Sequence, residues 1–558
     1  MVGCERDTPE SVRPLFEEVA ASAGLVFTHQ TGATGHKWFP ESYCGGVALF
    51  DFDNDGDLDV YFVQSGPLPH ERGDDDAGPG NVLFENRGDW TFVDVTERAG
   101  VGDTHYGIGV ACGDYDNDGH VDLYVLNLGA NVLYRNNGDG TFTDVTEAVG
   151  VGDAGNSVSG AFVDYDADGR LDLFVVNYID WTPEMNRATP CNDRWGNRDF
   201  CSPNVYDAPA RDTLYHNRGD GTFKDVSEPA GIHAAYGNGM GVVATDLDGD
   251  GRVDLYVTND ATPNQLWINN GDGTFRDEAL LAGCAVNKAG KPEAGMGVAA
   301  EDVDFDGDMD LFMVHLNNET NTLYRNDGGL FEDVTSRWGL DVTLPFTGFG
   351  TGLFDYDHDG LLDIFVANGR VNQWQNRAAD RNPYAEPDLL LHQTGGETFD
   401  DVGVTAGPYF QTSLTGRGAA FGDLDNDGDV DIVVVNADGP ARVLRNTCLG
   451  TDGAGTDRHW LMIRAVGTRD NRDAIGTRVR IVVDGKTRVR EVRAAYSYAS
   501  SNDFRVHFGL GRATAVSDLT LHWPDGTRER FGVDGIDRIM TVRQGDGIAL
   551  GNQDEQAS

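Results

Sequence analysis

The 558-residue sequence lacks the short motifs that mark the common enzyme classes. It has no Gly-x-Ser-x-Gly elbow, no phosphate-binding loop, no His-Glu-x-x-His pair and no dinucleotide fingerprint, and its 13 histidines show no zinc-ligand spacing. Basic residues are scarce as well, because 42 Lys and Arg stand against 92 Asp and Glu, for a formal charge of −50. Nucleic acids and anionic membrane surfaces are therefore disfavoured as partners, since both bind basic patches.

Long apolar runs and cysteines are also few. The amino terminus, which begins Met1-Val-Gly-Cys4, has no apolar stretch able to act as a signal or membrane span. Its Val-Gly-Cys resembles the end of a bacterial lipoprotein signal, so we expect either lipidation of Cys4, with the native start upstream, or a cytoplasmic start with an incidental cysteine. The six remaining cysteines are an even number, which fits an oxidising compartment, and only Cys191 and Cys201 are close enough in sequence to suggest a pairing.

The abundant feature is a nine-residue stretch, Asp-x-Asp-x-Asp-Gly-x-x-Asp, that occurs seven times. Alternating carboxylates on a tight loop supply the six to eight oxygens that Ca²⁺ takes at about 2.3–2.6 Å, and the glycine permits a sharp turn. The stretch resembles the start of an EF-hand loop, but no copy has Glu at position 12 and none precedes a helix. An Asp- and Gly-rich surface turn explains one copy; seven copies with identical acid spacing favour metal binding.

We predict up to seven structural Ca²⁺ ions, held by side chains at positions 1, 3, 5 and 9 and by the backbone carbonyl at position 7. The predicted ligand positions are Asp51, Asp53, Asp55, Asp57, Asp59, Asp114, Asp116, Asp118, His120, Asp122, Asp164, Asp166, Asp168, Arg170, Asp172, Asp246, Asp248, Asp250, Arg252, Asp254, Asp302, Asp304, Asp306, Asp308, Asp310, Asp355, Asp357, Asp359, Leu361, Asp363, Asp423, Asp425, Asp427, Asp429 and Asp431.

The acidic loops belong to a larger repeat. A short apolar run such as Leu123–Leu126 follows each loop and predicts a buried strand. A second signature, clearest at Asn131–Thr146, has an Asn-Gly-Asp-Gly centre that indicates a hairpin. Each unit therefore holds about four strands, and the pattern predicts an all-β fold with a seven-bladed β-propeller over residues 14–450.

The ends of the repeat region predict a closed ring. The seventh unit stops after Arg442–Asn446, and its missing strand is found at Leu15–Ala20, which would complete the last blade and remove two free sheet edges. Residues 1–13 are then a tether. Residues 457–548 are predicted to form a small β-sandwich-like domain, followed by a disordered tail at 549–558.

These motifs resemble a known family. The acidic loops and the signature at Asn131–Thr146 are similar to the FG-GAP (VCBS-type) repeats of integrin α-subunits and many bacterial exported proteins. The tail, with Asn471–Val479, Tyr496–Gly511 and Trp523–Gly526, is similar to the ASPIC/UnbV module, and the combination resembles the cartilage acidic protein family. The resemblance implies the architecture more than the activity. The sixth hairpin, at Leu390–Gly396, departs from the pattern, which leaves the outer edge of that blade open.

Three further places carry functional hypotheses. The insertion Tyr178–Tyr215 is either a lid or a disulfide-pinned spacer. The Gly-rich starts of the inner strands would either build a polar pocket at the channel mouth or allow close strand packing. Arginines of the C-terminal domain would bind an anionic ligand or, as we favour, dock onto the acidic propeller. The mouth residues are His105, Tyr106, Tyr236, Asn238, Glu293 and Arg417.

The sequence thus predicts an exported, calcium-binding propeller that acts as a binding or adhesion module for a protein or glycan, with membrane contact only through a lipid on Cys4. The alternative is an enzyme whose active site lies at the channel mouth beneath the insertion.

Overall fold

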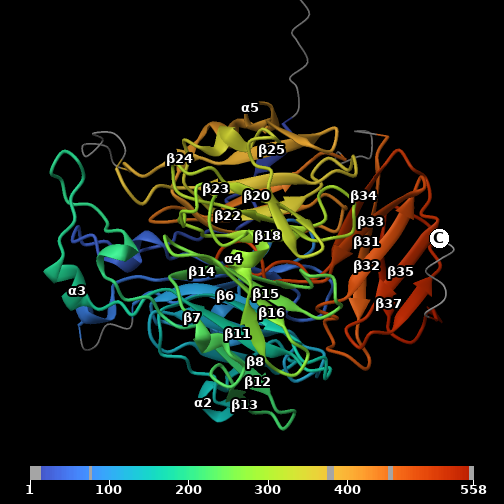
Figure 1. The fold of residues 1–558 in the computed structure, drawn as a ribbon, viewed down its shortest axis with the longest axis horizontal. Coiled ribbons are helices and arrows are strands. Elements are labelled where there is room, and N and C mark those ends of the chain that lie inside the picture. The colour runs from blue at the N-terminus through green and yellow to red at the C-terminus, as the bar shows by residue number, and fades with distance from the viewer. Residues whose placement is uncertain (1–13, 74–77, 374–381, 450–456, 552–558) are drawn as a thin grey trace, which may run out of the picture.

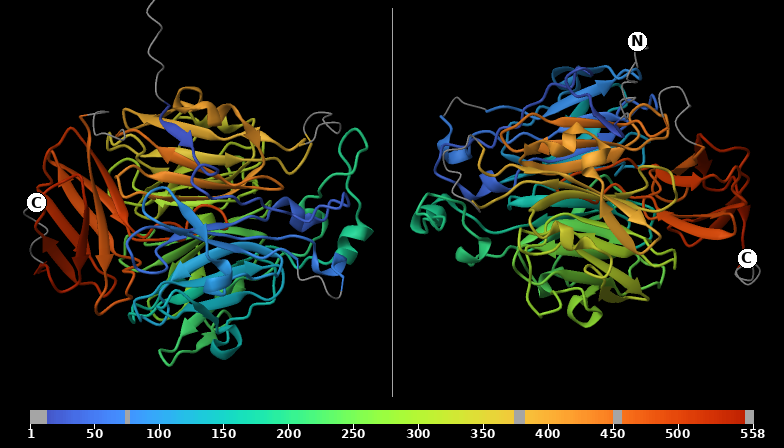
Figure 2. Two further views of the ribbon diagram at one scale, coloured as in Figure 1. Left: turned by 180° about the vertical axis from the view of Figure 1, so that it is seen from behind. Right: turned by 90° about the horizontal axis from the view of Figure 1, so that it is seen from above.

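The computed structural model describes residues 14–73, 78–373, 382–449 and 457–551 (Figure 1). Seven four-stranded antiparallel sheets surround a common axis, and a separate domain of two sheets lies beside them (Figures 1 and 2). The predicted all-β fold and seven-bladed propeller are therefore confirmed. The sixth blade, whose outer edge the sequence left open, has all four of its strands.

The seven blades follow one another along the chain. The first three consist of β2 (Val47–Phe50), β3 (Asp59–Phe62), β4 (Val82–Asn86) and β5 (Phe92–Asp94); β6 (Gly107–Gly113), β7 (Asp122–Asn127), β8 (Val132–Asn136) and β9 (Phe142–Asp144); and β10 (Ser157–Val163), β11 (Asp172–Asn177), β12 (Thr213–Asn217) and β13 (Phe223–Asp225). The next two consist of β14 (Gly239–Thr245), β15 (Asp254–Asn259), β16 (Gln265–Asn269) and β17 (Phe275–Asp277); and β18 (Val298–Glu301), β19 (Asp310–Met313), β20 (Thr322–Asp327) and β21 (Leu330–Asp333). The last two consist of β22 (Gly348–Phe354), β23 (Asp363–Asn368), β25 (Leu389–Thr394) and β26 (Thr398–Asp401); and β28 (Gly416–Gly422), β29 (Asp431–Asn436), β30 (Arg442–Asn446) and β1 (Phe16–Glu18).

Short helices and one small sheet connect the blades. The α-helices are α1 (Thr96–Ala99), α2 (Thr146–Val149), α3 (Pro183–Ala188), α4 (Ala279–Ala282) and α5 (Gly403–Ala406). The 3-10 helices are η1 (Phe39–Ser42), η2 (Pro69–Glu71), η3 (Pro203–Val205), η4 (Ile232–Ala234), η5 (Leu340–Thr343) and η6 (Pro408–Gln411). Strands β24 (Glu386–Pro387) and β27 (Ser413–Leu414) pair with each other.

Each blade places an acidic loop between its first two strands. In the second blade, β6 ends at Gly113 and β7 begins at Asp122, the last residue of the loop. All residues of β6 and β7 are buried, which agrees with the apolar run after the loop. The glycines of the inner strands permit close packing, since a Cβ on Gly109 would lie 2.1 Å from the carbonyl oxygen of Val158 in the next blade.

The ring is closed. The inner strands contact one another in sequence order, and β28 of the last blade contacts β2 of the first. Strand β1 is the outer strand of the last blade, because Phe16 pairs with Asn446 and Glu18 pairs with Leu444. The Phe16 ring is fully buried, with its centroid 6.1 Å from that of Tyr356 and 6.0 Å from that of Phe410. A segment near the start of the chain thus completes a blade built near residue 446.

The C-terminal domain is a pair of sheets with its own apolar core. Its strands are β31 (His459–Val466), β32 (Arg478–Val483), β33 (Lys486–Glu491), β34 (Val506–Gly511), β35 (Asp518–His522), β36 (Arg528–Phe531), β37 (Ile539–Arg543) and β38 (Ile548–Ala549). Ala549 pairs with Glu529, so the predicted disordered tail at 549–558 is wrong at its first residue. Residues 1–13, with the proposed lipidation site Cys4, and residues 552–558 lie outside the described part of the chain.

A loop of this domain enters the centre of the propeller. Ser501 bridges Ala48 of β2, Ser497 bridges Val298 of β18, and the backbone N–H of Val110 in β6 donates to the carbonyl of Ala499. Because these partners are inner strands of separate blades, the loop lies on the propeller axis. We call residues 494–503 the axial loop.

The axial loop reaches the far side of the channel. The Tyr498 side chain is fully buried, and its hydroxyl donates to the carbonyl of Tyr43, just after η1, at 2.5 Å. Its ring contacts that of Phe349, with the centroids 5.0 Å apart. The axis therefore holds protein from the C-terminal domain to η1.

Candidate functional site

The seven acidic loops share one backbone geometry. In six of the seven loops, the first aspartate accepts a hydrogen bond from the backbone N–H of the loop glycine. For example, Asp114 accepts from Gly119 at 2.7 Å and Asp355 accepts from Gly360 at 2.8 Å. Gly119 has a φ of 94°, a conformation that favours glycine. The turn that the sequence predicts is therefore formed, and it folds position 6 back over position 1.

The last aspartate of each loop ties the loop to the blade. Asp122 is fully buried and accepts hydrogen bonds from the backbone N–H of Tyr115 at 3.1 Å and of Asn136 in β8 at 2.7 Å. Equivalent pairs of hydrogen bonds form at Asp59, Asp254, Asp310, Asp363 and Asp431. The carboxylates at positions 1 and 9 are thus held in place by backbone donors.

The loop carboxylates meet in clusters. One oxygen from each of Asp51, Asp53 and Asp59, at positions 1, 3 and 9, lies within 4.8 Å of the others, and Asp114, Asp116 and Asp122 form the same arrangement. The third loop brings together Asp164, Asp166 and Asp168, at positions 1, 3 and 5.

The clusters fit a hard cation. Within the described residues, Oδ1 of Asp51, Oδ2 of Asp172 and Oδ1 of Asp302 are buried without a hydrogen-bond donor. Burial, followed by the charge of Asp473, raises the pKa of Asp114 to about 8. Buried, mutually repelling carboxylates with unpaired oxygens are the donor set that Ca²⁺ takes in proteins, and a bound dication would offset their charge.

Three side chains at position 7 contact their own loop or the neighbouring blade. Those of Arg170 and Arg252 pair with Asp168 and Asp250 of their own loops. The His120 ring lies 2.9 Å from the Asn54 amide of the preceding blade. That position 7 contributes only its backbone carbonyl to a metal stays a prediction.

Residues outside the nine-residue stretch also face the loops, and the sequence analysis missed them. His392 Nδ1 lies 2.9 Å from Asp363, His216 Nδ1 lies 3.2 Å from Asp172, and Arg445 pairs with Asp425 at 2.8 Å. Each precedes the Asn or Gln of the third strand whose N–H bonds the last aspartate. The available signal was that the Tyr-Arg-Asn core of the second signature places a basic residue at this position in several units.

The C-terminal domain docks onto the same face. Arg458 pairs with Asp357 at 2.6 Å, and Arg478 and Arg505 donate to the carbonyls of Asp246 and Asp423 at 2.9 and 2.8 Å. The favoured interpretation of the domain's arginines, docking onto the acidic propeller, therefore agrees with the structure. Because the docked side chains touch the loops, the acidic loops and the docked domain share one surface.

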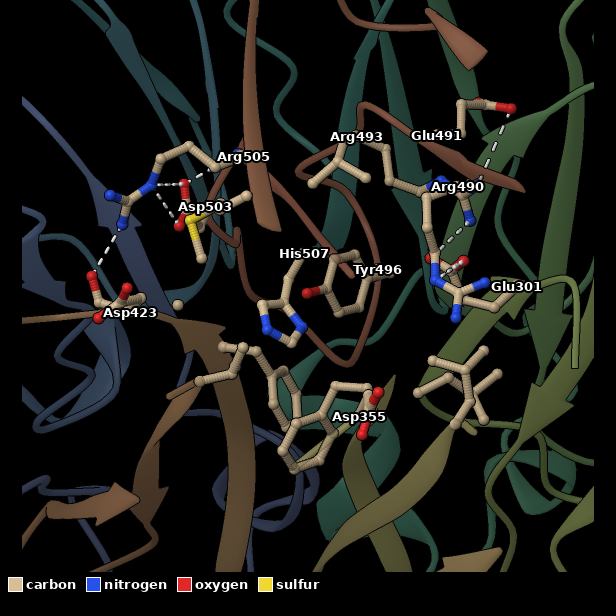
Figure 3. Close-up of a pocket in the computed structure, with 18 residues that line it drawn as sticks. Glu301, Asp355, Asp423, Arg490, Glu491, Arg493, Tyr496, Asp503, Arg505 and His507 are labelled. Atoms are coloured by element: carbon tan, nitrogen blue, oxygen red, sulfur yellow. Dashed lines mark hydrogen bonds and ion pairs between the residues drawn. The ribbon is translucent and has the colours of Figure 1, made fainter. Parts of the chain in front are cut away.

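A small cavity of about 80 Å³ lies at the centre of this interface (Figure 3). Charged side chains from both domains line it, and they pair with one another: Arg505 with Asp503 at 2.8 Å, and Arg490 and Arg493 with Glu301 at 3.7 and 3.8 Å. The paired charges identify this cavity as part of the docking interface.

The six predicted mouth residues make separate contacts. Arg417 is buried and donates to the carbonyls of Ser42, Gly369 and Gly416, while the Tyr106 hydroxyl donates to the carbonyl of Thr31 at 3.0 Å. The remaining four bond locally or face solvent: His105 to Asp103, Asn238 to the Asp260 carbonyl and Glu293 to Asn287, with Tyr236 59% exposed. The structure does not bring the six together, and Arg417 and Tyr106 serve packing inside the propeller.

The insertion, which carries α3, lies on the side of the propeller away from the C-terminal domain (Figure 1), and it helps to line a second cavity. Cys191 and Cys201 form the predicted disulfide, and α3 begins with Thr182 as its N-cap. The cavity, of about 400 Å³, is lined by residues 69–70, 128–129, 154–156 and 179–183. We call it the upper pocket. It combines apolar walls with a few polar groups, as small-molecule sites do.

Cys44, Cys112, Cys284 and Cys448 are free and buried. Among the described residues, none of the helices is long and apolar enough to cross a lipid bilayer.

Comparisons with known proteins agree with the architecture. Residues 51–125, 114–175, 196–257, 246–313 and 302–366 match the family described as FG-GAP-like repeat, and residues 467–549 match the family described as ASPIC and UnbV. Cartilage acidic protein 1 is similar to the chain: the Homo sapiens protein is 26% identical over 56% of this chain and 44% of its own length, and the Mus musculus protein is 26% identical over 56% and 45%. The chain thus matches less than half the length of these curated relatives. A solved Bacillus licheniformis rhamnogalacturonan lyase is 13% identical over 77% of this chain and 75% of its own, with a TM-score of 0.38, too low to support an argument.

Proposed function

The chain belongs to the FG-GAP-like repeat family and carries an ASPIC/UnbV domain, and from this premise we propose that it is an exported binding module, stabilised by calcium, for a protein or glycan ligand. The observation that carries the proposal is the recurrence of one acidic turn along the chain. In six of the seven loops the first aspartate accepts the N–H of the loop glycine, and Asp51, Asp172 and Asp302 each keep a buried, unpaired carboxylate oxygen. Such loops hold structural cations, which leaves the opposite face of the propeller for the ligand.

Export follows from the same chemistry. Extracellular calcium modules work with dissociation constants of about 10⁻⁴–10⁻³ M, a range that suits calcium outside the cell and not the cytosol. The disulfide between Cys191 and Cys201 supports the same compartment, because disulfides persist where the environment is oxidising.

Binding is favoured over catalysis at the channel mouth. An enzyme there would need free polar groups at the axis, but the axial loop fills the channel and Arg417 and Tyr106 are committed to carbonyl acceptors. We therefore assign the propeller the role of a scaffold that presents a binding surface.

Ion counting and ligand screening test the proposal. Native mass spectrometry at millimolar Ca²⁺ should show several bound ions that a chelator removes. A panel of glycans and exported proteins should give at least one ligand whose binding weakens after chelation. A protein that binds no Ca²⁺ at millimolar concentration would overturn the calcium assignment, and catalytic turnover of a panel compound would overturn the choice of binding over catalysis.

A further inference from the structure

We propose that the upper pocket binds one or two rings of a neutral saccharide, an inference that rests on the proposed function as a binding module and specifies its ligand. The pocket is separate from the acidic loops and from the axial loop. Its volume of about 400 Å³ falls in the range of about 300–1,000 Å³ that is usual for small-ligand sites.

One wall of the pocket is a fixed aromatic surface. Trp181 is 8% exposed and packs edge-on against Trp38, with ring centroids 6.2 Å apart and planes at 78°. The His70 ring lies at the same centroid distance from Trp181 but is tilted, with the planes at 50°. The Trp38 N–H donates to Glu71 at 2.7 Å, and this hydrogen bond fixes the Trp38 ring against Trp181. A pyranose would place its apolar C–H face against the part of the Trp181 ring that lines the pocket, and no side-chain freedom is lost because the ring is already held.

The pocket also offers an open acceptor. Asp180 lines it and is exposed, and among the described residues its carboxylate accepts no hydrogen bond. Two adjacent hydroxyls of a sugar can donate to one carboxylate. By contrast, Asn156 at the base is committed, since its amide donates to the Tyr43 hydroxyl at 2.8 Å and to the Ile179 carbonyl at 3.2 Å. Asp180 is therefore the group that would bind hydroxyls.

The charges around the pocket favour a neutral ligand. The Arg187 guanidinium lies 5.3 Å from the centre of the Trp38 ring and pairs with Glu184 at 2.8 Å. Neither Arg187 nor Trp38 lines the pocket, so this paired cation adds no free positive charge to the pocket walls. Burial lowers the pKa of His70, which favours the neutral form of its ring. An anionic sugar would meet the Asp180 carboxylate and be repelled.

The pocket is preformed. The insertion is closed by its disulfide and is tied to η1, because the Asn186 side chain accepts hydrogen bonds from the Phe39 N–H at 3.2 Å and from the Tyr206 hydroxyl at 2.7 Å. A ligand would enter a site whose walls need no rearrangement, which avoids the cost of ordering a loop.

The experiment uses the full chain with Ca²⁺ on a microarray of neutral, acidic and basic oligosaccharides. The best neutral oligosaccharide is then titrated calorimetrically, beside tetramethylammonium chloride as the cationic probe. Asp180→Asn and Trp181→Ala should each weaken neutral saccharide binding at least tenfold. The control is Trp195→Ala, because Trp195 is on the same insertion, 38% exposed, and does not line the pocket.

Three results would overturn the proposal: no binding of any neutral saccharide, neutral binding unchanged in both pocket variants, or preferred binding of tetramethylammonium or of an acidic oligosaccharide. Asp180→Asn changes an exposed side chain, so its effect does not depend on whether Trp181→Ala folds, and near-ultraviolet circular dichroism checks both. Calcium counted on the same samples separates the hypotheses, since bound Ca²⁺ without saccharide binding would reject only the pocket assignment.

Discussion

The aspartate at position 9 of each acidic loop stabilises its blade through hydrogen bonds that do not require a metal. Asp122 is fully buried and accepts two backbone hydrogen bonds, whereas Asp118 of the same loop is exposed and accepts them only from neighbours within the loop. Both belong to the predicted ligand set. Alanine substitutions at Asp122 and Asp118 should therefore lower the stability of the metal-free protein by very different amounts.

We predict that Asp122→Ala destabilises the protein even in the presence of a chelator. Two hydrogen bonds to a carboxylate are lost and two buried N–H groups are left unpaired, which together cost roughly 2–4 kcal/mol. Asp118→Ala should cost little under the same conditions. Urea unfolding of both variants in excess chelator measures the difference, and equal midpoints would show that position 9 acts only through the metal.

A second residue-scale prediction concerns Glu41 in η1. Both its carboxylate oxygens are buried and lack hydrogen-bond donors among the described residues, and burial raises its pKa to about 7 despite the charge of Lys37. Glu71 and Asp438 raise the pKa further.

Because the folded pKa of Glu41 exceeds the unfolded value, its protonated form favours the fold below about pH 4.5, and this contribution is lost as the pH rises through 7. We expect Glu41→Gln to be more stable than the parent protein at pH 8, by up to about 3 kcal/mol, and no more stable at pH 4.5. Thermal melts of both proteins across this range measure it. A difference that does not change with pH would contradict the buried, unpaired carboxylate.

At the scale of single residues, the sequence predicts the features that belong to the nine-residue stretch itself. The carboxylates and the turn glycine follow from their spacing. His392 could have been predicted only from the basic residue that precedes the Asn of the third strand in several units. Asp473 could not be predicted, because it reaches its loop from another domain and no local pattern encodes that contact.

At the scale of elements, the amino-terminal strand is a test of the closed ring. Phe16 is fully buried between Tyr356 and Phe410, and its strand pairs with β30. We predict that Phe16→Ala costs roughly 3–5 kcal/mol, as a buried aromatic truncation. Hydrogen exchange should show reduced protection in Arg442–Asn446, while Glu17→Ala, a partly exposed neighbour, should leave it unchanged. Full protection of β30 in the Phe16 variant would mean that β1 does not hold the last blade.

The axial loop explains the glycines at the starts of the inner strands, for which the sequence allowed either a polar pocket at the channel mouth or close strand packing. A Cβ on Gly46 would lie 2.1 Å from the carbonyl oxygen of Ala499, and one on Gly418 would lie 2.7 Å from the Ser500 hydroxyl. These glycines make room for a loop from another domain as well as for neighbouring strands. The strands themselves could be predicted from alternation and turn signals, but the occupant of the channel could not, since it is distant in sequence.

We therefore expect Gly46→Ala to loosen the C-terminal domain from the propeller. The added methyl group meets backbone, which cannot move aside cheaply, so the axial loop must shift. Limited proteolysis should cut the variant sooner near residue 457 than the parent. Gly73→Ala is the matched control, because nothing lies within 4 Å of the added atom. Identical cleavage of all three proteins would contradict the role of the axial loop as an anchor.

At the scale of the whole molecule, the chain has a formal charge of −50, and the C-terminal domain covers the propeller face that carries the acidic loops. Arginines of that domain meet the loops but do not neutralise all of them, as the unpaired buried oxygens of Asp51 and Asp302 show. Bound cations would supply the missing positive charge. Metal binding to the folded state alone adds stability by mass action, roughly 1–2 kcal/mol per site when free Ca²⁺ is about ten to twenty times the dissociation constant.

The last prediction concerns the removal of bound calcium from all the acidic loops at once. Chelation should lower the melting temperature markedly, because the charge repulsion returns in every occupied loop at once, whereas Asp116→Ala should cost far less because it affects one loop. Sodium chloride at matched ionic strength should recover little of the loss, since salt screens buried charges weakly. Mg²⁺ should also recover little, because it is smaller and demands octahedral geometry. Calorimetric scans with Ca²⁺, with chelator, and with each substitute make the comparison. An unchanged melt in excess chelator would mean that arginines and buried protons balance the loops without a metal, and the calcium assignment would then be wrong.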